Sequence, residues 1–190
     1  MMARAGLTRE RLARAGADLA DEVGFDKVTV TALARGFDVS VPSLYSHVKS
    51  SDDLKTLIAL LALDELAENL AAALAGRSGK QALAAFADVY RDYAVAHPGR
   101  YAAARLPLDP TTAAASAGPR HSQMTRAMLR EYTLTEADET HAVRLLGSVV
   151  HGYVSLELAG SFSHSAPTAQ ESWLRILDAL DALLRTWPTA

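Results

Sequence analysis

Apolar and small residues recur every three or four positions near the start of the 190-residue chain. This spacing places one continuous face on a helix, formed by Leu12, Ala15, Gly16, Leu19, Ala20 and Val23. Thr8 precedes the pattern as a capping residue, and Gly24 follows it as a residue that ends helices. The pattern therefore predicts an amphipathic helix between these two residues.

Capping residues predict three more helices in the first 75 residues. Thr29 precedes the short segment VTALAR, and Ser40 precedes a segment with a proline in its first turn, where proline is tolerated. Ser50 and Asp53 form a capping-box pattern ahead of a long apolar segment. The sequence therefore predicts short second and third helices and a fourth helix that runs to about Ala75.

Five further helices are predicted in the rest of the chain. They are a fifth that ends at Pro98, a short sixth over residues 100–105, a seventh around Met124 and Met128, an eighth from Thr135 to about residue 160, and a ninth with an apolar face from Trp173 to Trp187. The segment LPLDPTTAAASAGP, residues 106–119, is rich in turn residues and is expected to be a mobile connection. No strand pattern or internal repeat occurs, so we expect an all-α protein of about nine helices.

Composition agrees with a helical, cytoplasmic protein. Apolar residues make up 49% of the chain and aromatic residues only 6%, while alanine is abundant. Because no cysteine is present, disulfides and cysteine-ligated metals are excluded and a reducing compartment is expected. The first residues lack the apolar run of a signal peptide, and stretches such as Leu57–Leu63 are too short to cross a membrane.

The distribution of charge refines the choice of partners. The net charge is −3, which at first argues against a nucleic-acid partner. Residues 1–50 carry seven Lys or Arg against six Asp or Glu, a balance of +1, whereas residues 51–190 carry −4. Contact with DNA would therefore depend on a few placed groups rather than on a broad basic face.

The predicted second and third helices have the outline of a helix-turn-helix. They are joined by the tight turn GFDV and followed by the long capped helix. In such a unit the second helix of the pair lies in the major groove of DNA. The segment SVPSLYSH suits this role: Val39 and Leu44 can pack inward, while the side chains that face outward are Val41, Ser43, Tyr45, Ser46 and His47. Hydroxyls, His47 and the nearby Lys49 are groups that bind phosphate oxygens.

Residues 8–54 resemble the DNA-binding domain of the tetracycline-repressor (TetR) family. The resemblance is carried, in the order and spacing of the family pattern, by Thr29, Val39, Ser40, Leu44, Tyr45, His47 and Ser50. Asp38 stands where the family usually has glycine, and Val48 where an aromatic residue usually follows the histidine. Asp tolerates the left-handed backbone conformation at modest cost, so the turn is expected to survive.

The resemblance implies a homodimeric regulator with a helix-turn-helix domain over residues 1–50 and a helical ligand-binding and dimerisation domain over residues 51–190. It further implies a repressor that an unidentified small molecule releases from a palindromic DNA operator, with no cofactor. The implied DNA-contacting residues are Thr31, Arg35, Ser40, Val41, Ser43, Tyr45, His47 and Lys49. The segment VHGYVSLELAGSF resembles a subgroup named for a Trp, a His and a Gly, of which His151 and Gly152 are present and the Trp is replaced by Gly147.

Several residues of the second domain are candidates for the ligand pocket. Phe86, Tyr90 and Tyr93 form an aromatic face on the fifth helix, which can be core, pocket lining or both. His151 is either a satisfied core histidine or a polar group in the pocket. Glu157 is either a carboxylate that faces the ligand or one that reaches solvent near the end of its helix.

The predicted eighth helix carries a stripe of small residues at Ser148, Gly152, Ser155 and Ala159. The ninth helix carries a bulky row at Trp173, Leu177, Leu180 and Leu184. A small stripe lets another helix approach closely, so these residues predict a dimer interface of four helices, two from each subunit. The alternative is that the stripe accommodates the ninth helix of the same chain.

Two other classes of function are weighed against a regulator. An enzyme could use Ser155 with Glu157, or Ser163 with His164, but adjacent and i+2 residues do not face each other on a helix. No nucleophile elbow or glycine-rich phosphate loop occurs. Metal binding is not expected, because His141, His151 and His164 are too far apart along the chain for one helix to present two of them as ligands. A helical interaction module that does not bind DNA would leave the pattern of residues 40–50 unexplained.

Overall fold

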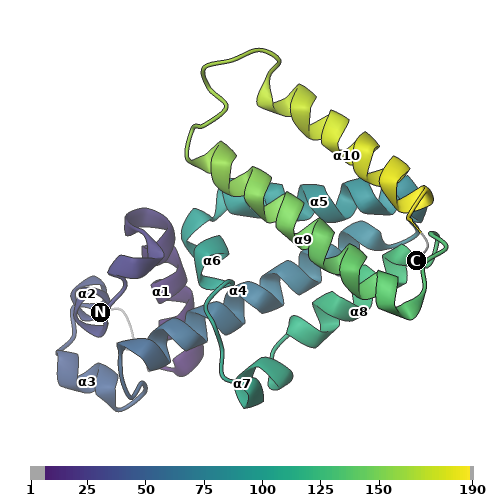
Figure 1. Ribbon diagram of the computed structural model, residues 1–190. Coiled ribbons are helices and arrows are strands. Elements are labelled where there is room, and N and C mark those ends of the chain that lie inside the picture. The colour runs from purple at the N-terminus through teal and green to yellow at the C-terminus, as the bar shows by residue number, and fades with distance from the viewer. Residues whose placement is uncertain (1–6, 189–190) are drawn as a thin grey trace. The chain divides into compact units, whose positions relative to one another are not determined.

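The computed structural model describes residues 7–188. All regular secondary structure in this range is helical, as predicted (Figure 1). The helices are α1 (Arg9–Val23), the 3-10 helix η1 (Phe25–Lys27), α2 (Val30–Phe37), α3 (Val41–Tyr45), α4 (Ser51–Leu74), α5 (Gly79–Ala96), α6 (Pro98–Ala103), α7 (Pro110–Ala115), α8 (Gly118–Leu129), α9 (Glu136–Leu158) and α10 (Ala169–Arg185).

The segment over residues 106–119 contains a helix that the sequence analysis did not predict. Asp109 accepts hydrogen bonds from the backbone N–H groups of Thr111 and Thr112, each at 3.1 Å, and Pro110 occupies the first helical position. Its hydrogen bonds with Thr112, above all, hold the pKa of the Asp109 carboxyl below its usual range. An acidic cap followed by proline is a helix start as well as a turn signal, so the expected connection contains a short helix.

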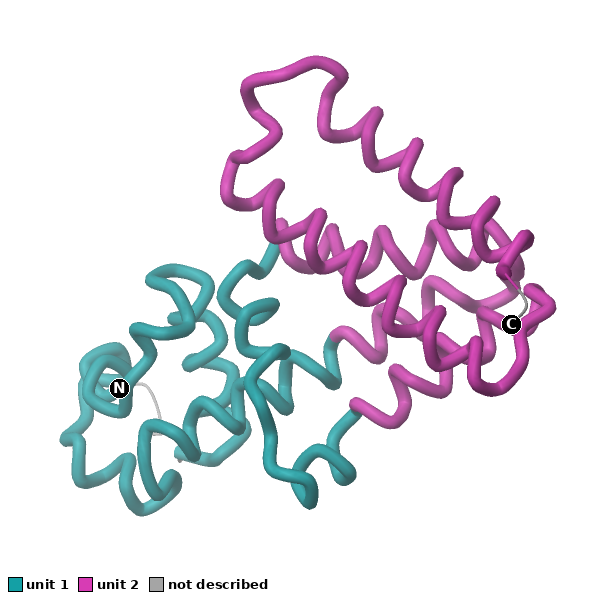
Figure 2. Tube along the Cα trace, in the orientation of Figure 1, with its two compact units in different colours: residues 1–65, 96–117 teal, residues 66–95, 118–190 magenta. Residues whose placement is uncertain are grey.

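The chain forms two compact units, each built from two separate stretches of sequence (Figure 2). The first unit comprises residues 1–65 and 96–117, and the second comprises residues 66–95 and 118–190. The first unit therefore includes the predicted DNA-binding segment, the first part of α4, and the whole of α6 and α7. The functional boundary at residue 50 stays a prediction.

The core of the first unit is made by apolar side chains from all of its early helices. Its fully or almost fully buried members include Leu12, Ala17, Ala20, Val28, Leu33, Leu44, Val48, Leu54 and Ile58. Gly16 allows α1 and α4 to approach closely, because a Cβ there would lie 2.7 Å from Cδ1 of Ile58. Leu44 of α3 shares this core with side chains of α1, α2 and α4, and the packing so positions the helix-turn-helix.

The interior of the second unit is organised around Trp173 of α10, whose side chain is fully buried. Its ring centroid lies 5.0 Å from that of Tyr153 in α9, and its Nε1 donates to Oδ1 of Asp88 in α5 at 2.7 Å. The helices α5, α9 and α10 are thus joined through one aromatic side chain. Thr168 and Glu171 form a capping box that begins α10.

Candidate functional site

The turn between α2 and α3 is closed by a residue in the left-handed conformation. Asp38 has φ 51° and ψ 45°, and its backbone N–H donates to the carbonyls at the end of α2. The N–H of Val39 then donates to the carbonyl of Ala34 at 3.2 Å. Asp therefore takes the place of the expected glycine without loss of the turn.

Two buried side chains attach α3 to the rest of the first unit. Leu44 and Val48 are 0% and 1% exposed, and the carbonyl of Leu44 accepts hydrogen bonds from the N–H groups of His47 and Val48. Val48 thus provides an apolar anchor at the position where the family pattern has an aromatic residue. Val39 is half-buried, as expected. Val41, which was expected to face outward, is also half-buried and packs against the core.

The remaining candidate DNA contacts lie on the surface of the first unit. Tyr45 is 50% exposed. His47 is half-buried, and the exposed candidates are Thr31, Arg35, Ser40, Ser43 and Lys49. The hydroxyls of Ser40 and Ser43 share a hydrogen bond of 2.8 Å. Phenol, imidazole, hydroxyl and ammonium groups of this kind are suited to phosphate and sugar oxygens.

Arg9 stabilises the segment that carries His47 and Lys49, a role that could not be predicted from the sequence. Its guanidinium donates to the carbonyl of His47 at 2.7 Å and forms an ion pair with Asp53 at 3.0 Å. Asp53 also accepts a hydrogen bond from the backbone N–H of Lys49 at 2.8 Å. The hydrogen bond from Arg9 has the largest effect, and together with that from Lys49 it holds the pKa of the Asp53 carboxyl below its usual range. In the sequence, Arg9 is only a basic residue directly after the capping residue Thr8, and this position gives no indication that Asp53 is its partner.

The aromatic face of α5 lies inside the second unit. Phe86 and Tyr93 are buried, and Tyr90 is half-buried with its ring centroid 5.0 Å from that of Phe86. The hydroxyl of Tyr90 lies 2.9 Å from Nδ1 of His121, a buried residue of α8. Thr125 donates to the carbonyl of His121 at 2.9 Å. A small polar cluster thus lies among apolar side chains, and sequence reasoning did not include its histidine.

Glu157 is half-buried and forms an ion pair with another helix. Both of its oxygens accept from the guanidinium of Arg91 in α5, at 2.6 and 2.7 Å. The guanidinium also lies over the Trp173 ring, 5.3 Å from its centroid, and the bond to Glu157 raises the pKa of Arg91. His151 is half-buried, with Nε2 3.1 Å from the hydroxyl of Ser155 on the same helix.

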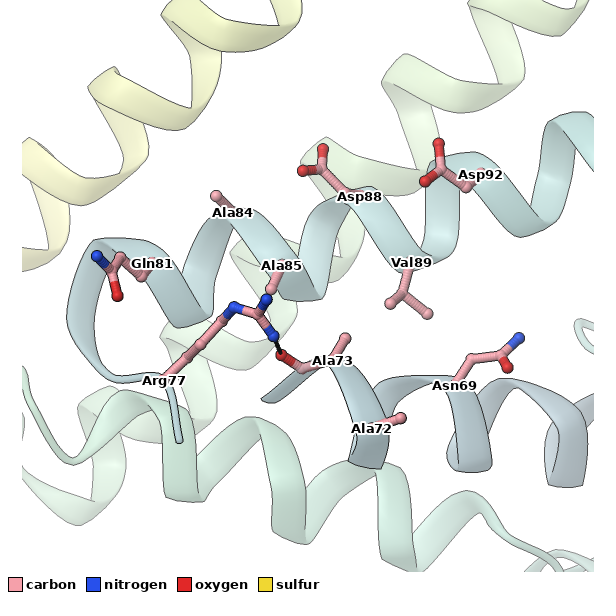
Figure 3. A pocket seen from close by; sticks show the side chains of 10 residues that line it. All are labelled: Asn69, Ala72, Ala73, Arg77, Gln81, Ala84, Ala85, Asp88, Val89 and Asp92. Atoms are coloured by element: carbon pink, nitrogen blue, oxygen red, sulfur yellow. Dashed lines mark hydrogen bonds between the residues drawn. The ribbon is translucent and has the colours of Figure 1, made fainter. Parts of the chain in front are cut away.

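A surface hollow of about 880 Å³ lies between the end of α4 and α5 in the second unit (Figure 3). Small side chains of both helices form much of its wall, and Asp88, Asp92 and Arg77 contribute charge. Arg77 donates to the carbonyl of Ala73 across part of this space. The predicted pocket residues do not line this hollow.

The predicted dimer residues separate into two groups. On α9, Ser148 and Ala159 are exposed, Gly152 and Ser155 are half-buried, and a Cβ on Gly152 would meet no atom within 4 Å. The α10 helix of the same chain therefore does not fill the small stripe. The bulky row on α10 is buried inside its own unit, with exposures of 0–6%, so expecting Trp173, Leu177, Leu180 and Leu184 to meet a partner was wrong. The exposed large apolar residues of these helices are Leu156, Leu158, Leu174 and Leu183.

Two other kinds of site are absent from the described part of the chain. In the range 7–188, no group of three or more His, Cys, Asp or Glu side chains is placed to hold a metal ion. Across the same described residues, every helix is too short or too polar to span a bilayer.

Comparison with known proteins places the chain in a family. Residues 83–180, just over half of the chain, match the tetracyclin repressor-like C-terminal domain. The chain is 36% identical over 160 residues to the uncharacterized HTH-type transcriptional regulator Rv0681 of Mycobacterium tuberculosis, a match that covers 82% of this chain and 72% of that protein. It is 28% identical over 187 residues to the uncharacterized HTH-type transcriptional regulator YobS of Bacillus subtilis, covering 98% and 94%.

The fold agrees with this placement. The structure superposes with a TM-score of 0.73 on a single-residue variant of TetR from Acinetobacter baumannii AYE in complex with minocycline, at 18% identity over 97% of this chain and all of that one. The helix-turn-helix geometry, the matched C-terminal domain and the relatives agree with one another. The chain therefore belongs to the tetracycline-repressor family of helix-turn-helix transcriptional regulators.

Proposed function

We propose that this protein is a cytoplasmic homodimeric repressor that binds a palindromic operator and is released from it by a small molecule. The observation that carries the proposal is the placement of α3. Leu44 fixes one side of this helix in the core, and Val48 anchors the turn that follows it, while Ser43 and Tyr45 of the helix are exposed. A helix that is anchored on one side and polar on the other is suited to enter the major groove.

The proposed contacts with DNA are of two kinds: those that position the protein on the DNA backbone and those that read the bases. Tyr45, His47 and Lys49 bind phosphates after α3 has entered the groove, with Thr31 and Arg35 of α2 as further backbone contacts. Arg9 is occupied by Asp53 and the His47 carbonyl, so it supports this surface rather than contacting DNA. Phosphate contacts set the register of the protein on the duplex and carry no sequence information directly.

The second subunit docks on α9. The small stripe with its open space at Gly152 permits close approach of a partner helix, and Leu156 on α9 and Leu174 on α10 are further exposed apolar side chains of this unit. In the dimer the two α3 helices stand about 34–36 Å apart, which is one turn of DNA.

The effector binds in the second unit and shifts the population of dimers toward a spacing that does not fit the operator. The polar cluster of Tyr90, His121 and Thr125 offers hydrogen bonds in an apolar environment, as effector sites do. The minocycline complex of the structural relative supports the idea that this fold accepts a drug-sized ligand.

A salt titration of DNA binding tests the proposal. The full-length protein is mixed with labelled duplex from the region upstream of its own gene, and binding is followed by fluorescence anisotropy. A regulator should bind with an affinity that falls steeply with salt, because phosphate contacts release counterions. Absence of binding to this region and to random duplex at low salt would reject a DNA-binding function.

A further inference from the structure

We propose that α3 reads its operator half-site mainly through the C5-methyl groups of thymine, which contact Val41 and Pro42, and not through hydrogen bonds to base edges. The inference rests on the proposed function as a DNA-binding regulator. It assigns the class of base contact that gives that site its specificity.

The first argument is the set of side chains that α3 presents. Residues 39–48 read VSVPSLYSHV and contain no Arg, Lys, Asn, Gln, Asp or Glu. Bidentate hydrogen bonds to guanine come from Arg or Lys, those to adenine from Asn or Gln, and hydrogen bonds from cytosine go to Asp or Glu. The helix in the groove therefore lacks every side chain that makes the strong base-specific hydrogen bonds.

The second argument is that the three serine hydroxyls of this segment already have hydrogen-bond partners within it. Ser40 and Ser43 share a hydrogen bond of 2.8 Å, and Ser46 donates to the carbonyl of Ser43 at 2.7 Å. Serine can donate to one base and accept from another, so it discriminates weakly even when free. The hydroxyls thus contribute little to the choice of sequence.

The third argument is the fixed apolar edge at the start of the helix. Val41 packs partly against the core, and this contact restricts its side chain. The adjacent Pro42 is exposed, and its side chain is a rigid ring. The first residues of the second helix approach the base edges in this motif, and the thymine methyl is the apolar feature of the major groove. Two apolar groups that are already immobile lose little entropy when they bind it.

The test begins with selection of binding sites from random duplex by the full-length protein. Each thymine of the selected half-site is then replaced by deoxyuracil, which removes only the methyl group. We expect about fourfold weaker binding at one or two positions per half-site, the value of one buried methyl. At the same positions, 5-methylcytosine paired with guanine should bind better than unmethylated cytosine paired with guanine, because the methyl and not the thymine oxygen is read.

Protein variants assign the effect to the proposed residues. In Val41→Ala the ratio of thymine to uracil affinity should fall toward one, whereas Ser43→Ala, the matched control on the same helix, should keep the wild-type ratio. Thermal melting of both variants checks that they fold. The series of uracil-containing sites is measured with the wild-type protein, so it tests the inference even if a variant does not fold. Equal affinity for thymine and uracil at every position of a selected site would overturn the inference and leave DNA binding intact. Failure to bind any duplex would overturn both.

Discussion

Asp21 of α1 accepts the backbone N–H of Arg100 at 2.9 Å and so caps the first turn of α6 from another helix. Its second oxygen lies 3.1 Å from Nε of Arg100 and 3.1 Å from Nδ1 of His97. The Arg100 guanidinium, which is 15% exposed, also reaches Asp18 and Glu65. One carboxylate thus supplies the cap that His97, at the N-cap position, does not provide.

We expect Asp21→Ala to lower the free energy of unfolding by about 2 kcal/mol, because it leaves the partly buried N–H of Arg100 without its acceptor and removes one of the carboxylates around the guanidinium. Asp21→Asn is the matched control, since its carbonyl oxygen can still accept the N–H of Arg100, and it should cost about half as much. Urea denaturation measures both. If both variants lose the same free energy of unfolding, the hydrogen bond from the N–H of Arg100 contributes nothing and only the charge of Asp21 matters.

The close approach of α6 to α1 leads to a second prediction. A Cβ on Gly99 would lie 2.1 Å from the backbone carbonyl of Ala20, and a backbone cannot turn aside as a side chain can. We expect Gly99→Ala to destabilise the protein by more than about 2 kcal/mol. At Gly36, within α2, a Cβ would meet nothing within 4 Å. Gly36→Ala should therefore stabilise the protein by about 0.5–1 kcal/mol, and a destabilised Gly36→Ala would contradict this account.

The exposed Tyr45 gives a prediction for DNA binding. We expect Tyr45→Phe to weaken binding about threefold to tenfold on all sequences, because the proposed function assigns the hydroxyl to a phosphate contact. The slope of log affinity against log salt should change little, since no charge is lost, whereas Lys49→Gln should reduce the slope by about one. Anisotropy titrations at several salt concentrations measure both. Loss of binding confined to one base pair would instead place Tyr45 at a base edge.

The open space at Gly152 makes the dimer interface testable without damage to the fold. We expect Gly152→Leu to fold and to weaken the dimer, because the new side chain occupies the surface that a partner helix must approach. Ala137→Leu adds the same side chain at an exposed position in the first turn of α9 and should leave the dimer unchanged. Sedimentation equilibrium distinguishes the two. An intact Gly152→Leu dimer would place the interface elsewhere.

The ion pair of Arg9 and Asp53 predicts a pH dependence. The pKa of Asp53 is lower in the folded than in the unfolded protein, so its stabilising effect is present above the unfolded value and is lost as pH falls through the folded value. Wild-type stability should fall more than that of Asp53→Asn between about pH 5 and pH 2, by less than about 1 kcal/mol because the pair is partly exposed. Asp52→Asn, at an exposed neighbour, is the control. Parallel losses in all three proteins would assign the effect to other carboxylates.

Local chemistry made most of the helices predictable. Thr8, Thr29 and Thr135 each accept a backbone N–H at the start of the helix that they were expected to cap. A cap acts within three residues of itself, so the sequence holds all the information that it needs. Asp109 obeys the same rule, and α7 was missed because its Asp-Pro pair also occurs in turns.

Contacts between distant residues were not predictable in the same way. A helical pattern indicates that one face of α10 is apolar but not which surface covers it, and Trp173 proved to be covered by its own unit. Glu157 has Arg91 as its partner, 66 residues away, and no spacing in the sequence connects them. The candidate DNA contacts could be proposed as a set because they lie along the continuous segment of α2, the turn, α3 and the residues just after it, whereas Arg9 comes from a different helix.

The discontinuous first unit limits how the DNA-binding part can be exchanged between regulators. A fragment that ends within α4 would lack α6, and the surface that α6 covers on α1, at Ala20 and Asp21, would be left open. A chimaera that carries this operator specificity must therefore include residues 96–117 as well as 1–65. Since the intervening residues belong to the other unit, the exchange has several junctions within the chain rather than one.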